Sequence, residues 1–210
     1  TLKQYPITFP SMESFRDEDF VVTPLNEGDV SHILSLDSWS SSCLIIFGEA
    51  GAGKTHLLNM WGRKHNAVKV DRACDIGALL GSENQSFAVD SIENWIGDET
   101  SEHMLFHLYN HCKLNDLSLL LTSEKKLVDY NFIKADLSSR LKSADYVILE
   151  KPDDIQLKAI LVKLFSDHQL QADIGVVDYI VNRCERSIDS LRKLVYVIDH
   201  NSLAEKKIFY

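Results

Sequence analysis

The sequence predicts an α/β fold with a parallel β-sheet, followed by a smaller domain that is entirely helical. Short apolar segments alternate with helical patterns in residues 15–152, and the first of these segments leads directly into a glycine-rich loop and a helix. Residues 153–210 contain helical patterns only. We therefore expect a tail in residues 1–14, an α/β domain in 15–152 and a helical domain in 153–210.

Five short segments rich in Val, Ile, Leu and aromatic residues are the candidate strands. They have the continuous apolar character of strands that are covered on both faces. Because helical patterns lie between them, we expect right-handed βαβ crossovers and a parallel sheet. The candidate strands are Leu44–Phe47, Ala67–Val70, Phe87–Val89, Leu117–Thr122 and Tyr146–Leu149.

The helical domain begins after Pro152, which interrupts the chain, and Asp153 or Asp154 can cap the helix that follows. Two apolar stripes at helical spacing predict helices that pack together, and we expect Ser187 to cap the second one. The first stripe contains Leu157, Ile160, Leu161, Leu164 and Phe165, and the second contains Ile188, Leu191, Val195 and Ile198.

Composition and charge restrict the class of protein. The 210 residues are 45% hydrophobic and 25% charged, as in an ordinary globular protein. The net charge of −9 argues against a large nonspecific DNA-binding surface, so we expect any contact with DNA to be indirect. The four cysteines are scattered, and the sequence has neither an apolar run of transmembrane length nor a secretory signal pattern. We therefore expect a cytoplasmic protein with reduced thiols and no membrane partner.

The glycine-rich loop after the first strand matches the pattern G-x-x-x-x-G-K-[ST] at every fixed position. Its glycines let backbone N–H groups turn towards a diphosphate, and the positive end of the following helix faces the same phosphates. Lys54 supplies a charge for the β and γ phosphates, and Thr55 supplies a hydroxyl for Mg²⁺. The sequence thus predicts a nucleotide site with Mg²⁺. The candidate nucleotide ligands in this region are Gly48, Gly51, Ala52, Gly53, Lys54, Thr55 and His56.

The ends of two other strands supply further polar groups. Asp90 follows an apolar strand and is expected to bind the Mg²⁺ held by Thr55. In P-loop ATPases that hydrolyse rapidly the next residue is usually a second acid, but here it is Ser91. Glu93 follows on the opposite side of the turn or at a helix start, so we expect weak or no intrinsic ATPase activity. The hydroxyl of Thr122 could either reach the γ-phosphate or simply make a hydrogen bond at the end of its own strand.

A short helical segment before the last strand contains the candidate catalytic residue, Arg140. We expect an exposed Arg there to point away from the phosphates of its own chain. It could enter the nucleotide site of a neighbouring molecule and neutralise charge as the γ-phosphate is lost. On spacing alone, a solvated surface arginine is the alternative.

Four motifs follow the loop in series: Asp90-Ser-Ile-Glu-Asn-Trp-Ile-Gly97-Asp98, Leu105-Phe-His-Leu-Tyr-Asn110, Leu119-Leu-Leu-Thr-Ser and Asp136-Leu-Ser-Ser-Arg-Leu. The series resembles the DnaA branch of the AAA+ ATPases, and most closely its Hda subgroup, the regulatory inactivators of DnaA. The resemblance runs over nearly the whole chain. It implies an AAA+ base domain with a helical lid, and Arg140 at the arginine-finger position of the family.

Two segments before the loop also carry the resemblance. Asp19-Phe-Val-Val-Thr-Pro-Leu-Asn26 resembles the stretch that helps hold adenine in this family, which implicates Val21, Val22 and Asn26. Gln4-Tyr5-Pro6-Ile7-Thr8-Phe9 resembles the sliding-clamp-binding motif of the Hda subgroup. Pro6 favours an extended segment in which alternate apolar residues can enter a groove on a partner. The candidate clamp-binding residues are Gln4, Tyr5, Ile7 and Phe9, and self-packing of the tail is the alternative.

One departure from the family pattern concerns the lid. Many AAA+ proteins place an arginine that reaches the phosphates in a motif matching Arg186-Ser-Ile-Asp189-Ser-Leu191, and here that position is Asp189. An acid would repel phosphates, so we expect Asp189 to point elsewhere. Nucleotide affinity and the discrimination of ATP from ADP by the lid are therefore in question.

The resemblance implies a regulator of replication initiation that binds ADP or ATP with Mg²⁺. It would dock on the β subunit sliding clamp of DNA polymerase III, near the nucleoid and replisome, and stimulate hydrolysis of ATP held by DnaA. The sequence also allows a homodimer or a larger oligomer. The alternative is a DnaA-like initiator or helicase loader, although an initiator would continue beyond Tyr210 into a DNA-binding module. An adaptor with a vestigial nucleotide site is a third possibility, and a metabolic P-loop kinase fits least well.

Overall fold

Five parallel strands form one sheet in the computed structural model, which describes residues 20, 22, 26–81 and 85–206. The strand order is β2-β3-β4-β1-β5, and every pair is parallel, as predicted. The strands are β1 (Cys43–Phe47), β2 (Val68–Val70), β3 (Phe87–Val89), β4 (Leu119–Ser123) and β5 (Asp145–Ile148). The predicted bounds of β3 match, and those of the other four strands differ from these by one or two residues.

The largest difference lies at the start of β4. The sequence pattern predicts Leu117 in this strand, but its N–H donates to the carbonyl of Cys112 and so closes the end of the preceding helix. Asp116 has a φ of 53°, which turns the chain out of that helix. The strand ladder therefore begins two residues later, at Leu119.

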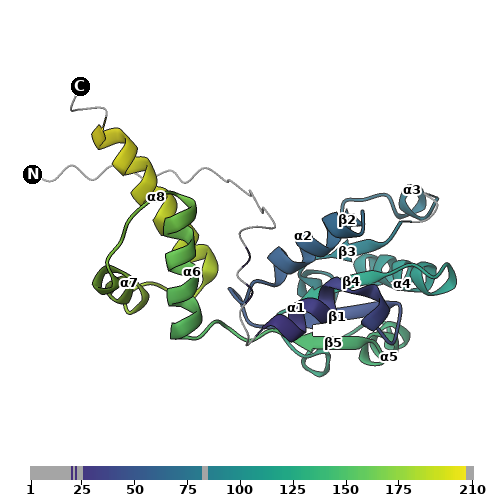
Figure 1. Ribbon diagram of the computed structural model, residues 1–210. Coiled ribbons are helices and arrows are strands. Elements are labelled where there is room, and N and C mark those ends of the chain that lie inside the picture. The colour runs from purple at the N-terminus through teal and green to yellow at the C-terminus, as the bar shows by residue number, and fades with distance from the viewer. Residues whose placement is uncertain (1–19, 21, 23–25, 82–84, 207–210) are drawn as a thin grey trace, which may run out of the picture.

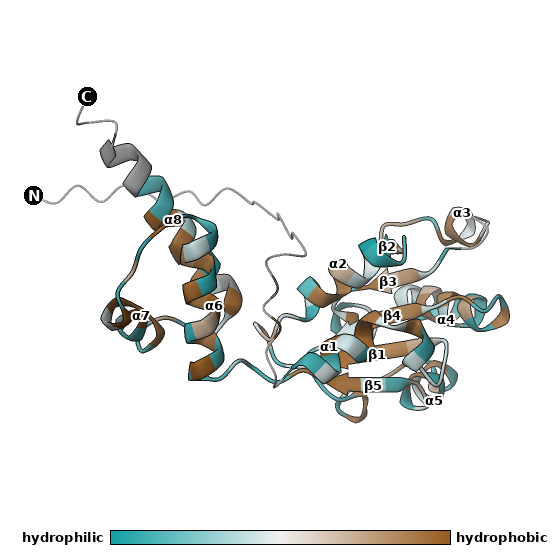
Figure 2. Cartoon of the chain, in the orientation of Figure 1, coloured by the Kyte–Doolittle hydropathy of each residue, from teal (hydrophilic) through white to brown (hydrophobic). Residues whose placement is uncertain are grey.

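Helices cover both faces of the sheet (Figure 1). The helices of the α/β domain are α1 (Glu27–Leu34), α2 (Lys54–Lys64), α3 (Ile76–Leu80), α4 (Glu99–Leu114) and α5 (Ala135–Lys142). Short 3₁₀ turns lie at η2 (Leu36–Ser38), η3 (Ile92–Asn94) and η4 (Leu127–Asp129). Helices α1 and α2 pack on one face, and α4 and α5 pack on the other. Figure 2 shows the strands between them as a hydrophobic layer.

Strand β1 contributes side chains to both cores. Leu44 and Ile46 face the core that includes α1 and α2, whereas Cys43, Ile45 and Phe47 face the core that includes α4 and α5. All five residues are buried. This is the reason why the strand reads as a continuous apolar run rather than as an alternating one.

Three helices form the lid beside the α/β domain: α6 (Asp154–Asp167), α7 (Ile174–Val181) and α8 (Ile188–Lys206) (Figure 1). Asp153 accepts from the backbone N–H of Gln156 and forms a capping box, as the sequence allows. Ser187 Oγ accepts from the N–H of Ser190 at 3.1 Å, which confirms the predicted cap of α8. The first apolar stripe is buried, and in the second stripe Ile188 and Ile198 are only partly buried.

The four cysteines are free thiols. Cys43 and Cys112 are buried, and burial raises the pKa of Cys112 to about 12 and that of Cys43 well above its ordinary value. In the part of the chain that the structure describes, none of the helices has the length and apolar character needed to cross a membrane.

A buried carboxylate joins α4 to the segment that leads into α5. Glu102 has no exposed surface. It accepts hydrogen bonds from the backbone N–H groups of Gly97 (2.9 Å), Ile133 (3.0 Å) and Lys134 (2.7 Å). This side chain therefore holds the start of the helix that carries Arg140.

We predict that Glu102→Ala lowers the free energy of unfolding by about 3 kcal/mol or more, because it leaves three backbone donors without their acceptor. Urea denaturation measures the change. The control is Glu99→Ala, which removes an exposed carboxylate from the first turn of the same helix and should cost less than about 1 kcal/mol. Equal effects of the two substitutions would contradict the assigned role of Glu102.

Candidate nucleotide-binding site

The glycine-rich loop connects β1 to α2 at the carboxyl edge of the sheet. Gly51 and Gly53 have φ values of 82° and 94°, which side chains rarely tolerate. A Cβ atom on Gly51 would lie 2.7 Å from Cβ of Ser187, at the start of α8. The loop therefore needs glycine both for its own turn and for the close approach of the lid.

Lys54 begins α2 and is held inside this loop. Its Nζ donates to the carbonyl oxygens of Gly48 (2.6 Å) and Glu49 (3.0 Å), and the residue is only 7% exposed to solvent. Burial lowers the pKa of Lys54, while the nearby carboxylate of Glu124 opposes this shift. The loop thus holds a buried ammonium group at the position where the sequence predicts contact with the β and γ phosphates.

The structure brings Thr55 and Asp90 together, as expected for a shared Mg²⁺. Thr55 Oγ1 donates to Asp90 Oδ1 at 3.2 Å. Hydroxyl and carboxylate oxygens are the ligand atoms that Mg²⁺ prefers, and the ion completes its shell with water and phosphate. This pair of residues therefore fits the ion that the sequence predicts.

Thr122 orients this acid. Its Oγ1 donates to Asp90 Oδ1 at 2.6 Å and accepts from the N–H of Ser91 at 2.7 Å. Thr122 is completely buried, so its hydroxyl is engaged within the protein. Two alternatives were open for this residue. The geometry favours a hydroxyl that hydrogen-bonds to groups at the ends of neighbouring strands over one that contacts the γ-phosphate.

Two charged residues near the acid have contacts that the sequence pattern does not predict. Lys69 Nζ on β2 lies 3.5 Å from Asp90 Oδ2. In the sequence, the feature that could have pointed to Lys69 is its position between two valines of a candidate strand. Glu93 Oε2 accepts from the N–H of Glu124 at 3.3 Å, so this carboxylate turns towards the end of β4. Ser91, with a φ of 57°, makes the sharp turn that separates Glu93 from Asp90.

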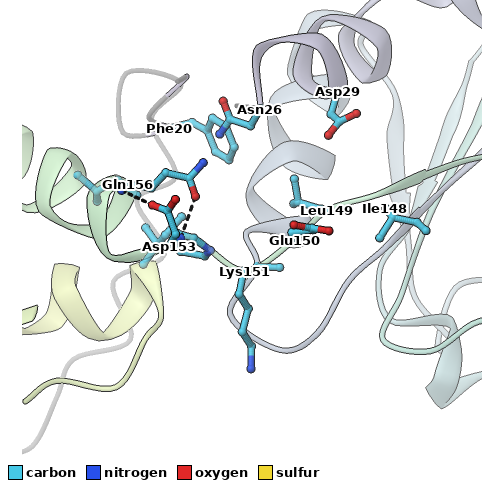
Figure 3. Close-up of a pocket in the computed structure, with 13 residues that line it drawn as sticks. Phe20, Asn26, Asp29, Ile148, Leu149, Glu150, Lys151, Asp153 and Gln156 are labelled. Atoms are coloured by element: carbon cyan, nitrogen blue, oxygen red, sulfur yellow. Dashed lines mark hydrogen bonds between the residues drawn. The ribbon is translucent and has the colours of Figure 1, made fainter. Parts of the chain in front are cut away.

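A cavity of about 430 Å³ adjoins the loop (Figure 3). Asn26 lines it, as the resemblance implies for an adenine contact, and so does Ala52. Phe20, which no sequence motif singles out, lines it as well. The other lining residues come from the start of α1, the end of β5 and the segment after it, and helices α6 and α8: Asp29, Ile148, Leu149, Glu150, Lys151, Pro152, Asp153, Gln156, Ile160 and Ile188.

The other candidate adenine and phosphate ligands do not line this cavity or lie outside the described residues. His56 is buried, with its ring centroid 5.4 Å from that of Phe20, and does not line the cavity. Val22 is half-exposed and is also not among the lining residues. Val21 and the tail residues Gln4, Tyr5, Ile7 and Phe9 lie outside the described residues.

Arg140 lies on α5, which runs from the carboxyl edge of the sheet back to the start of β5. Arg140 thus lies in the last turn of this helix, towards the edge opposite its own glycine-rich loop. It is half-buried rather than exposed, however. Its guanidinium carbon lies 5.0 Å from the ring centroid of Phe106 and 5.9 Å from that of Tyr109, both on α4, and cation–π attraction explains this packing.

Two curated relatives illustrate the sequence similarity. The chromosomal replication initiator protein DnaA of Bacteroides thetaiotaomicron is 28% identical over 176 residues, which cover 74% of this chain and 37% of that protein. The chain thus spans little more than a third of that relative. An uncharacterised protein of Haemophilus influenzae is 26% identical over an alignment of 223 residues, covering 98% of this chain and 94% of that protein. No family model matches the sequence.

Solved structures show the same relation at the level of fold. Domain III of the Thermotoga maritima replication initiation protein DnaA has a TM-score of 0.75 at 19% identity, over 94% of this chain and 93% of that one. The replication initiator DnaA bound to AMPPCP and single-stranded DNA has a TM-score of 0.69 at 18% identity, over 90% of this chain and 67% of that one. This chain therefore has the fold of an AAA+ ATPase domain and is related in sequence to the DnaA proteins.

Proposed function

We propose that this protein binds ADP or ATP with Mg²⁺ and regulates replication initiation as a regulatory inactivator of DnaA, the role of the Hda subgroup. The observation that carries the nucleotide site is the arrangement of Lys54, Thr55 and Asp90 around one loop. The similarity to DnaA proteins and the AMPPCP in a structurally similar DnaA support the same site.

In this proposal each group at the site has a distinct task. Lys54 moves from the loop carbonyls to the β and γ phosphates and neutralises their charge. Thr55 and Asp90 hold Mg²⁺, which bridges the same phosphates. Asn26 and Phe20 line the end of the cavity that receives the adenine. Since Ser91 follows Asp90 and Glu93 turns towards β4, no carboxylate directly follows the metal ligand, and intrinsic hydrolysis is slow.

The proposed action on DnaA depends on Arg140. When the two proteins associate, its guanidinium group leaves the rings of Phe106 and Tyr109 and enters the nucleotide site of DnaA. Its planar fork there bonds two oxygens of the γ-phosphate as charge develops. The tail in residues 1–14 binds the sliding clamp as an extended segment, which brings the complex to DNA indirectly.

A DnaA-like initiator or helicase loader is the second candidate. It is favoured by the likeness to a DnaA structure in which that protein is bound to single-stranded DNA as well as to AMPPCP. The net charge of −9 disfavours it, because DNA binding needs clustered cations. Stimulation of DnaA-bound ATP hydrolysis separates the two candidates, since only the regulator requires it.

Replacement of Lys54 tests the nucleotide site. Lys54→Ala should weaken ADP binding about 100-fold or more, because it removes a buried cation that makes charge-assisted bonds to phosphate. Calorimetric titration measures the affinity. Lys64→Ala, an exposed substitution on the same helix, should leave it unchanged. ADP affinity that is the same in both variants would show that the loop is not the nucleotide site.

Replacement of Arg140 tests the action in trans. Arg140→Ala should lower the stimulated rate of DnaA-bound ATP hydrolysis about 1,000-fold, with folding, nucleotide binding and clamp binding retained. Arg140→Lys should rescue poorly, because an ammonium group lacks the planar fork. The assay follows ATP turnover on DnaA with the clamp loaded on DNA. Lys142→Ala, exposed on the same helix, is the control. Full stimulation by Arg140→Ala would refute the mechanism and favour an adaptor.

The tail is tested separately. Replacing both Gln4 and Phe9 with Ala should abolish binding to the clamp, because it removes the amide and one apolar anchor of an extended motif. The melting temperature should not change. Thr8→Ala, within the same motif but outside its apolar alternation, is the control for surface plasmon resonance on immobilised clamp. A large drop in melting temperature with clamp binding retained would instead indicate a self-packed tail.

A further inference from the structure

An ion pair joins the glycine-rich loop to the segment that connects the two domains. Lys151 Nζ lies 2.6 Å from Glu49 Oε2. Glu49 belongs to the loop, and its carbonyl oxygen accepts from the ammonium group of Lys54 at 3.0 Å. Lys151 lies between β5 and α6, three residues before the helical lid begins. This ion pair therefore connects the phosphate-binding loop with the segment that leads into the lid.

We propose that Lys151, which pairs with Glu49 of the loop, is a γ-phosphate ligand and exchanges this carboxylate for ATP. The inference rests on the proposed nucleotide site and adds to it a residue that distinguishes ATP from ADP. Because Lys151 immediately precedes the lid, the same exchange would change the position of α6 according to the nucleotide that is bound.

The orientation of the side chain fits this role. Lys151 lines the cavity but extends away from Phe20 and Asn26, which lie at its other end (Figure 3). Its charge lies near the phosphate end instead, since it pairs with the loop and contributes to the lowered pKa of Lys54. The cavity thus has an aromatic and amide end for a base, while Lys151, which lines it together with the carboxylates Asp29, Glu150 and Asp153, pairs with the loop.

The strength of the ion pair permits an exchange. The side chains of Lys151 and Glu49 are 43% and 75% exposed, so water screens their attraction and the pair is weak. Lys151 still holds the pKa of Glu49 below its ordinary value, which keeps this carboxylate charged beside the loop. Since a γ-phosphate oxygen accepts the same kind of charge-assisted bond and the phosphate group carries a larger negative charge than a carboxylate, the γ-phosphate can displace Glu49 as the partner of Lys151.

Two other cations of the lid pair with carboxylates within the lid itself. Arg186, which precedes α8, lies 3.0 Å from Asp154 of α6. Lys158 of α6 lies 2.7 Å from Asp178 of α7. Both of these pairs are exposed and lie within the lid. Lys151 differs from both because its partner is part of the phosphate-binding loop.

The test compares the affinities of AMPPCP, which resists hydrolysis, and ADP in the presence of Mg²⁺. Lys151→Met should weaken AMPPCP binding about tenfold and ADP binding less than about twofold. Glu49→Gln should tighten AMPPCP binding, because the competing carboxylate is gone. In the double variant the benefit of Glu49→Gln should disappear, which a double-mutant cycle measures directly. Lys158→Met is the matched control and should change neither affinity.

The outcomes separate this inference from the proposed site. If Lys54→Ala abolishes binding but Lys151→Met leaves the ratio of AMPPCP to ADP affinity unchanged, Lys151 is not a γ-phosphate ligand and the nucleotide site stands. Equal weakening of both nucleotides by Lys151→Met also overturns the inference, since it indicates a general charge effect. If Lys54→Ala binds ADP normally, the site itself is wrong.

Discussion

The burial of β1 between two parallel neighbours determines where the other parts of the site lie. Its five residues are buried, and it pairs with β4 on one edge and β5 on the other. The ladder continues past its end, where Gly48 donates to Ser123 and Leu149 donates to Phe47. The glycine-rich loop, the polar end of β4 and the segment leading to the lid must therefore meet at one edge of the sheet.

The hydrogen bonds at this edge order the metal ligands across separate strands. Thr122 on β4 donates to Asp90, which follows β3, and Thr55 on α2 donates to the same carboxylate oxygen. Because hydroxyl groups from two other elements donate to this one oxygen, bonds within the protein itself define the orientation of the acid. Such preorganisation lowers the cost of ordering the site upon binding.

The edge of the α/β domain that carries the glycine-rich loop and the edge near Arg140 are physically connected. Helix α5 starts near the nucleotide edge, where Glu102 holds the segment before it, and ends at the opposite edge near Arg140. The rings of Phe106 and Tyr109 on α4 then support the guanidinium group. Helix α4 thus holds the start of α5 through Glu102 and supports Arg140, near the end of α5, through its two rings. The lid contacts the loop through Ser187.

The sequence by itself determined the parallel α/β domain, the helical lid and the loop with Lys54 and Thr55. These depend on local patterns: apolar runs, capping residues, and glycines at fixed spacing before a helix. Only the tertiary structure decided what Thr122, Phe20, Glu102 and Lys151 contact. Their partners lie on other elements, so neither spacing nor propensity reports them. The tertiary structure also decided the half-buried position of Arg140, because aromatic rings on a separate helix produce it.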